Sequence, residues 1–339
     1  MLIRVAPHAT PGMHGRVEVR EELCRGVASA VRGIRIRYIK TVDARRLGGR
    51  EPALRLLFYY MAINHDTRGM RGFVDGKQYR GSQYLYHAMR VVAENDPGAF
   101  GAERLANLTL SEFMGWFVGG TPPRRPMERV ALLRDAAEVL RLRYGGCVGK
   151  LLEECRGYVG GPGGLVDRLR EFRAYSDPLA KKSMVFAMLL QMEGLFTPRD
   201  PWNITVGVDY HLQRVALRTG MVEVVDEGLR RKLLYGRFVS EGEHMEVRKA
   251  CLEAYKIVGE NLNWDATRVD QTFWHLGRSC CKYVQPPCGE NECKERSCTL
   301  QENSSYRCRG RCPLNGVCMA SVDGRYLRLR EPKVITYFY

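Results

Sequence analysis

Eight of the chain's 12 cysteines lie between Cys280 and Cys318, and they are the densest set of chemically reactive side chains in the sequence. Cys281 and Cys288 are separated by six residues, and Cys312 and Cys318 by five. In an intracellular protein, cysteines at such spacing indicate a metal before disulfides. Four thiolates suit either a [4Fe-4S] cluster or a tetrahedral zinc ion. The spacing therefore predicts a metal-binding loop and leaves both metals open.

Two adjacent lysines, Lys181 and Lys182, form the second reactive set, in the stretch "SDPLAKKSMVFAMLLQ". Asp177 as N-cap and Pro178 at the first helical position predict a helix start here. An apolar run over 184–190 predicts that this helix lies in the core. A helix N-terminus disfavours a cation, and with burial it lowers a lysine pKa and favours a nucleophile. The alternative is that both side chains extend to water.

A single carboxylate, Asp209, is the third candidate, in "ITVGVDYHLQRVALRTG" over 204–220. Its position predicts an N-cap for a helix over 210–219. A carboxylate at a helix N-terminus stays ionised easily, which suits a group that stabilises a developing cation. His211 lies one turn inside the same helix, so we expect a structural role for it.

The cysteine loop resembles the iron-sulfur loop of the endonuclease III and adenine glycosylase superfamily, with its pattern Gly-Arg-x-x-Cys-x6-Cys-x2-Cys-x5-Cys. Gly277 and Arg278 stand in register with Cys281, and "CPLNGVC" resembles the last two ligands. The resemblance implies a [4Fe-4S] cluster on four residues, with zinc as the alternative metal: Cys281, Cys288, Cys312 and Cys318.

The loop departs from that pattern between its second and third ligands, where residues 289–311 replace two residues. Cys308 could take the place of Cys288. The cysteines outside the ligand set could pair as disulfides, bind a second metal or stay free: Cys280, Cys293, Cys298 and Cys308. Basic side chains along the loop could follow a phosphate backbone: Lys282, Lys294, Arg296, Arg307, Arg309 and Arg311.

The aspartate segment resembles the Val-Asp-x-His-x-x-Arg-Val motif at the catalytic aspartate of helix-hairpin-helix DNA glycosylases. It matches at five positions: Val208, Asp209, His211, Arg214 and Val215. The usual Leu-Pro-Gly-Val-Gly hairpin is absent, and Gln191 stands where its lysine would, which argues against an ordinary endonuclease III activity. The segment "KSMVFA" instead is similar to the Lys-Thr-x-Val-Phe-Ala motif of archaeal 8-oxoguanine DNA glycosylases. Lys182 is the matching lysine, 27 residues before Asp209, and Lys181 is its substitute.

The resemblance implies a DNA glycosylase with abasic-site lyase activity in base excision repair, acting on a damaged base, with an oxidised purine preferred. Lys182 would form a Schiff base, and Asp209 would stabilise the oxocarbenium-like transition state. One alternative is an N-glycosidase for a modified nucleoside or nucleotide, similar to queuosine-salvage enzymes. Another is a nucleic-acid-binding protein without activity on the same scaffold.

The charge of the chain favours a polyanionic partner, since its 339 residues carry a formal net charge of +15 and a pI near 9.4. Of 53 basic residues, 42 are arginine, which binds phosphate in a bidentate manner. Arginine richness also accompanies thermophily. No segment predicts a membrane span or a signal peptide. We expect an intracellular, cytoplasmic and nucleoid-associated monomer that binds damaged double-stranded DNA.

Helical spacing dominates the sequence and predicts an all-α protein with the two-lobed helix-hairpin-helix glycosylase fold and a C-terminal cysteine-rich metal loop. The predicted parts are an N-terminal basic region over 1–50, a helical core over 51–278 hinged near 157–164, a cluster loop over 279–320 and a strand-like tail over 321–339. Two alternating stretches, 34–42 and 326–339, are predicted to pair as a small ribbon.

Overall fold

The computed structural model describes residues 15–284, 286–288, 292–295 and 298–339. The first 14 residues of the predicted N-terminal basic region, and Arg296 of the cysteine loop, lie outside the described residues. The chain divides into two compact units. The cysteine unit contains the described residues up to Arg37 together with Val208–Ile335, and the lysine unit contains Tyr38–Gly207 together with Thr336–Tyr339.

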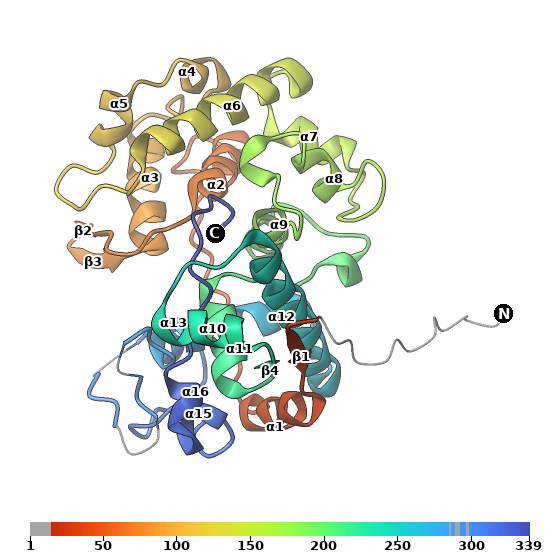
Figure 1. The fold of residues 1–339 in the computed structure, drawn as a ribbon. Helices are drawn as coiled ribbons and strands as arrows, with labels where there is room; N and C mark the ends of the chain where they lie inside the picture. Colours follow the sequence, from red (N-terminus) through yellow and green to blue (C-terminus); the bar gives the residue numbers. More distant parts are fainter. Residues whose placement is uncertain (1–14, 285, 289–291, 296–297) are drawn as a thin grey trace. The chain divides into compact units, whose positions relative to one another are not determined.

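The lysine unit is built around one buried helix, α2 (Arg50–Ile63), ten of whose 14 residues are buried. It packs against α9 (Lys181–Glu193), α6 (Pro126–Tyr144), α3 (Ser82–Asn95) and α7 (Val148–Glu154). The remaining short helices are α4 (Ala102–Ala106), α5 (Leu110–Gly115) and α8 (Leu165–Leu169) (Figure 1). Aromatic rings fill the centre, where Phe58 stacks on Tyr175 at 5.4 Å and meets Phe186 of α9 edge-on at 6.0 Å.

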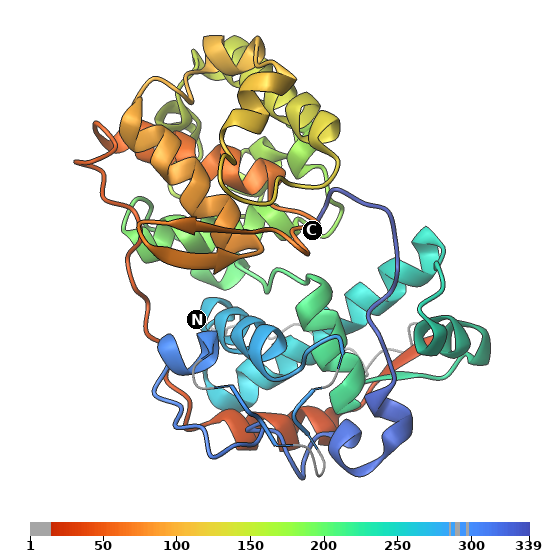
Figure 2. The same cartoon turned by 90° about the vertical axis from the view of Figure 1, so that its left-hand side faces the viewer.

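A hairpin of two short strands, β2 (Arg71–Val74) and β3 (Lys77–Arg80), also belongs to the lysine unit. It packs against α3, as the orange segments of Figure 2 show. Its turn is Asp75-Gly76, and both residues have positive φ, at 51° and 73°. Asp-Gly is the preferred pair for such a two-residue turn, so the sequence does carry a signal for this hairpin.

The cysteine unit packs α1 (Glu21–Val31) against α12 (Glu241–Leu262), and α10 (Tyr210–Thr219) against α13 (Ala266–Ser279). Strands β1 (Val17–Val19) and β4 (Val222–Val224) pair antiparallel, with Val17 opposite Val224. The other helices are α11 (Glu227–Tyr235), α14 (Thr299–Glu302), α15 (Met319–Val322) and α16 (Gly324–Leu327). Helix α12 begins with a capping box, in which Ser240 and Glu243 bond each other's backbone N–H.

The structure confirms a mainly helical protein, the coarser part of the predicted fold class. The ribbon predicted from 34–42 and 326–339 is wrong. These stretches make only isolated bridges, Ile36 with Ser304 and Phe238 with Lys333. Neither stretch forms a strand that could pair with the other, and the second begins inside α16, which covers 324–327. None of the described helices combines the length and the apolar character that crossing a bilayer requires.

Candidate functional site

Helix α9 begins at Lys181, three residues later than Pro178, where the sequence placed its first position. Asp177 still caps the segment, because its carboxylate accepts hydrogen bonds from the backbone N–H of Leu179 at 3.2 Å and of Lys181 at 2.9 Å. Ala180, the N-cap, has φ 52° and ψ 30°, a left-handed conformation that is costly for a residue with a Cβ. The turn of 177–180 therefore places both lysines in the first turn of the helix.

Lys182 is the more buried of the two lysines, with none of its surface exposed, whereas Lys181 keeps 6%. Nζ of Lys182 donates a hydrogen bond to the carbonyl oxygen of Ala62, in the last turn of α2, at 2.5 Å. Burial, followed by the charges of Lys181 and Arg129, holds the pKa of Lys182 well below its usual value. The side chain predicted to be a nucleophile thus lies where its neutral amine form is favoured.

A second buried cation, Arg129 of α6, bonds the carbonyls that follow Ala62. Its guanidinium donates to the carbonyl oxygens of Ile63 and His65. The ring of His65 bonds Glu128, with 3.0 Å between Nε2 and Oε1. These side chains of α6 were not found from the sequence, because no local pattern connects them with Lys182.

The C-terminal residues, Thr336–Tyr339, pack within the lysine unit beside this cluster. The Tyr337 ring lies 6.0 Å from Nζ of Lys182 and 5.7 Å from the guanidinium of Arg173. Its hydroxyl is 3.4 Å from the hydroxyl of Ser176. Arg125 donates to the carbonyl oxygen of Thr336 at 2.8 Å. The tail thus places an aromatic face near the lysine, a role that sequence reasoning did not assign to it.

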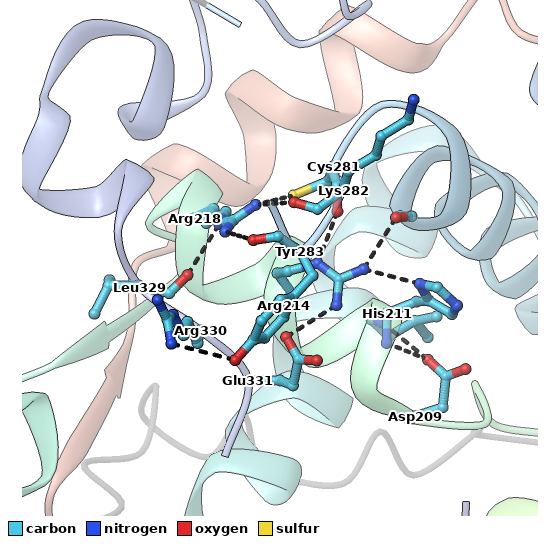
Figure 3. A network of polar contacts seen from close by, with 12 residues as sticks. Asp209, His211, Arg214, Arg218, Cys281, Lys282, Tyr283, Leu329, Arg330 and Glu331 are labelled. Atoms are coloured by element: carbon cyan, nitrogen blue, oxygen red, sulfur yellow. Dashed lines mark hydrogen bonds and ion pairs between the residues drawn. The ribbon is translucent and has the colours of Figure 1, made fainter. Parts of the chain in front are cut away.

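In the cysteine unit, Asp209 is the N-cap of α10, as predicted. Its Oδ1 accepts hydrogen bonds from the backbone N–H of His211 at 2.7 Å and of Leu212 at 3.0 Å (Figure 3). The side chain is buried, with 6% of the residue exposed. These N–H groups and the helix field favour the ionised carboxylate.

Arg214, one turn further along α10, is a buried hub of the cysteine unit (Figure 3). It donates to the carbonyl oxygens of Cys281 at 2.7 Å and Gly277 at 3.1 Å, and it pairs with Glu331 at 2.9 Å. Burial lowers the pKa of Arg214, but the charges of Glu331 and Cys281 raise it by more, so the pKa is raised overall. Its Nη2 also lies 3.0 Å from Nδ1 of His211, which must accept because arginine only donates.

Glycine at position 277 permits the close approach of α10 and α13 on which this hub depends. A Cβ there would lie 2.9 Å from Cβ of His211 and 3.2 Å from the backbone oxygen of the same residue. That spacing leaves no room for a side chain. Close packing against His211 therefore explains why glycine stands at position 277, the first residue of the Gly-Arg pair before Cys281.

Arg218 extends the network to the cysteines (Figure 3). It donates to the carbonyl oxygens of Lys282 at 2.6 Å and Tyr283 at 3.2 Å, and its Nη1 lies 3.6 Å from Sγ of Cys281. Cys318 donates from Sγ to the backbone oxygen of Arg218 at 3.3 Å. Helix α10 therefore carries Asp209 at its start and a cation beside the cysteines near its end.

All four cysteines predicted as ligands line one cavity, of about 360 Å³ counting its mouth, and Cys280 lines it as well. The other three cysteines of the loop are not among its lining residues: Cys293, Cys298 and Cys308. Burial raises the pKa of the Cys288 thiol to about 11 and also raises that of Cys318, while a hydrogen bond with Cys280, followed by burial, raises that of Cys312. In the described part of the chain, no three histidine, cysteine or acidic side chains are grouped to hold one metal ion.

Lys182 belongs to the lysine unit and Asp209 to the cysteine unit. Comparison of the chain with models of known protein families and with curated proteins found no match.

Replacing Lys182 with Met removes a buried titrating amine, which favours the folded state, but it also removes the donor to the carbonyl oxygen of Ala62, which costs about 1–3 kcal/mol. The folded-state pKa of Lys182 is lowered, so between it and the ordinary value of 10.5 the unfolded state binds more protons. Wild-type stability therefore rises with pH across this window, and the stability of the variant relative to wild type is expected to fall by at least about 1 kcal/mol between pH 7 and pH 10. Urea unfolding from pH 7 to 10 measures the difference.

The matched control is Lys150→Met, at an exposed position of α7 in the same unit. Its effect on stability is expected to stay within about 0.5 kcal/mol at every pH. A pH-independent effect of Lys182→Met would contradict a lowered pKa at that site.

Proposed function

We propose that this protein is a DNA N-glycosylase with abasic-site lyase activity that acts on an oxidised purine. The observation that carries the proposal is the amine of Lys182, buried in the first turn of α9 beside other cations. A surface lysine is an ammonium ion at neutral pH and has no lone pair with which to attack. Burial and like charges favour the neutral form, which is the nucleophile in Schiff-base chemistry.

The reaction begins when Nζ of Lys182 attacks C1′ of the damaged nucleotide and the base leaves with the electron pair of the glycosidic bond. The sugar gains positive charge as this bond breaks, and a nearby carboxylate lowers the barrier. Asp209 is suited to this role because two N–H groups of α10 favour its charged form. Ring opening gives the Schiff base, from which β-elimination cleaves the strand.

The partner in this proposal is duplex DNA carrying a lesion. The net charge of +15 favours a polyanion. Exposed cations of the cysteine loop can meet phosphates: Lys294, Arg307, Arg309 and Arg311. Lys282 is already paired with Glu295 at 2.6 Å, so it contributes less. The target base has to leave the stack before C1′ is accessible, and a damaged base costs less to extrude.

We further propose that the cysteine cavity holds a [4Fe-4S] cluster on Cys281, Cys288, Cys312 and Cys318. The donor set fits, because four cysteines face one space and the burial of Cys288 and Cys318 disfavours free thiolates without a cation. The cluster would fold the loop and present its cations.

The proposed function is tested by incubating the protein with duplexes carrying different lesions in the presence of borohydride, which reduces a Schiff base to a stable adduct. Lys182→Ala is expected to abolish adduct formation on the preferred lesion, because it removes the amine that forms the Schiff base. Lys181→Ala is the matched control from the same helical turn and is expected to keep adduct formation within a few-fold of wild type. An undiminished adduct with Lys182→Ala would refute the assignment.

Asp209→Asn separates the charge of this residue from its capping role. Asparagine caps a helix about as well as aspartate, so stability is expected to change by less than about 1 kcal/mol. Base excision is expected to slow by roughly 100-fold or more, because the charge that stabilises the transition state is lost. Single-turnover rates and DNA affinity are measured together. A variant of normal rate would show that Asp209 is only a cap.

Cys281→Ala is expected to lose the brown colour and visible absorption of an iron-sulfur cluster after anaerobic purification, together with much of the bound iron. Cys147→Ala, in the lysine unit, is the matched control and is expected to keep both. Metal analysis distinguishes the two candidates. Stoichiometric zinc without iron in the wild-type protein would contradict the cluster.

A further inference from the structure

His65 is a buried histidine that the chemistry described so far leaves unused. Its side chain is fully shielded from solvent, and Nε2 lies 3.0 Å from Oε1 of Glu128. Because a carboxylate only accepts hydrogen bonds, Nε2 carries the hydrogen and Nδ1 keeps its lone pair. Among the described residues, Nδ1 has no hydrogen-bond partner. A buried acceptor without a partner costs about 1–3 kcal/mol of folding free energy.

The surroundings of this ring are strongly cationic. Burial, and then the charge of Lys182, lower the pKa of His65 well below its ordinary value. The charged groups around it come from the end of α2, from α6 with the residue before it, and from α9: Asp66, Arg125, Glu128, Arg129, Lys181 and Lys182. Glu128 is the anion in contact with the ring, and Arg125 pairs with the same carboxylate at 3.1 Å. At neutral pH the imidazole is therefore uncharged.

The two titrating groups, Lys182 and His65, oppose each other's charge. A proton on the amine lowers the affinity of the ring for a proton, and loss of charge from the amine restores it. Glu128 remains in place to stabilise an imidazolium. The cluster therefore disfavours protons on both nitrogens at the same time.

We propose that Nδ1 of His65 accepts the proton that the Lys182 nitrogen loses when it bonds to the sugar, an inference that rests on the function proposed above. The Nζ lone pair forms the bond to C1′ while the bond from C1′ to the base breaks and its electron pair leaves with the base. The nitrogen is then positively charged and holds one proton more than the neutral product amine. That proton moves to Nδ1, and the imidazolium keeps its Nε2–H on Glu128.

The same transfer occurs on an abasic site, where Nζ adds to the C1′ aldehyde and the carbonyl oxygen later leaves as water. An abasic duplex therefore isolates the lysine chemistry from base excision. The rate of borohydride-trapped adduct formation on this duplex, followed from pH 5.5 to 9, is the readout of proton removal.

His65→Gln keeps an N–H donor for Glu128 but removes the base. Its trapping rate is expected to fall roughly 100-fold at pH 7, within the range for a lost general base. The deficit should narrow as pH rises, because hydroxide replaces the imidazole. DNA affinity is expected to be unchanged. His87→Gln is the matched control: His87 of α3 also has a buried Nδ1 without a partner and a pKa lowered to about 4, but it stacks on Tyr79. It should trap at the wild-type rate.

Rescue by added bases distinguishes proton transfer from packing. Imidazole is expected to restore trapping by His65→Ala at least tenfold, and substituted imidazoles to do so in order of their basicity. Pyrazole, of the same size but weakly basic, should fail. Equal rescue by pyrazole, or wild-type rates and pH dependence in His65→Gln, would overturn the assignment while leaving the lyase function intact. Absence of any adduct with wild-type protein would overturn both.

A measurement on unmodified protein guards against variants that do not fold. Nitrogen-15 NMR of histidine-labelled wild type is expected to show His65 as a neutral ring, with hydrogen on Nε2, at pH 7. A charged ring, or hydrogen on Nδ1, would leave no lone pair to accept a proton and would also overturn the inference.

Discussion

Buried basic side chains that bond the carbonyls at helix C-termini are the interaction on which both units depend. The last four carbonyls of an α-helix have no partner within the helix and need donors when they are buried. Lys182 and Arg129 supply them at the end of α2, at Ala62 and Ile63. In the cysteine unit, Arg214 does the same for Gly277, in the last turn of α13. The negative end of the helix dipole offsets part of the cost of burying the two guanidinium groups.

This arrangement has different consequences in the two units. In the cysteine unit, Arg214 has Glu331 as a counter-ion and serves architecture, since it joins the start of α10 to the end of α13 and to Cys281. In the lysine unit, Lys182 has a carbonyl partner rather than an ion pair of its own, and further cations surround it. A guanidinium stays charged under such conditions, whereas an amine can release its proton. The lysine unit therefore has the properties of a reactive site held in place at some cost in stability.

Local signals in the sequence predicted the parts of this arrangement that depend on neighbouring residues. Asp209 as the N-cap of α10 and the lysines at the start of α9 both follow from spacing and capping. The partner of Lys182, Ala62, lies 120 residues earlier, and no pattern connects the two. His65, Glu128 and Tyr337 meet the lysine only through tertiary packing, so their roles could not be predicted. The β2–β3 hairpin is different, because its Asp-Gly turn was a local signal that sequence reasoning passed over.

In the proposed reaction, one buried amine, that of Lys182, bonds to DNA. To test this, the protein–DNA adduct is reduced with borohydride, both components are digested and the modified residue is identified by tandem mass spectrometry. The sugar remnant is expected on Nζ of Lys182 and on no other amine. Attachment to Lys181, to the N-terminal amine or to scattered surface lysines would contradict it.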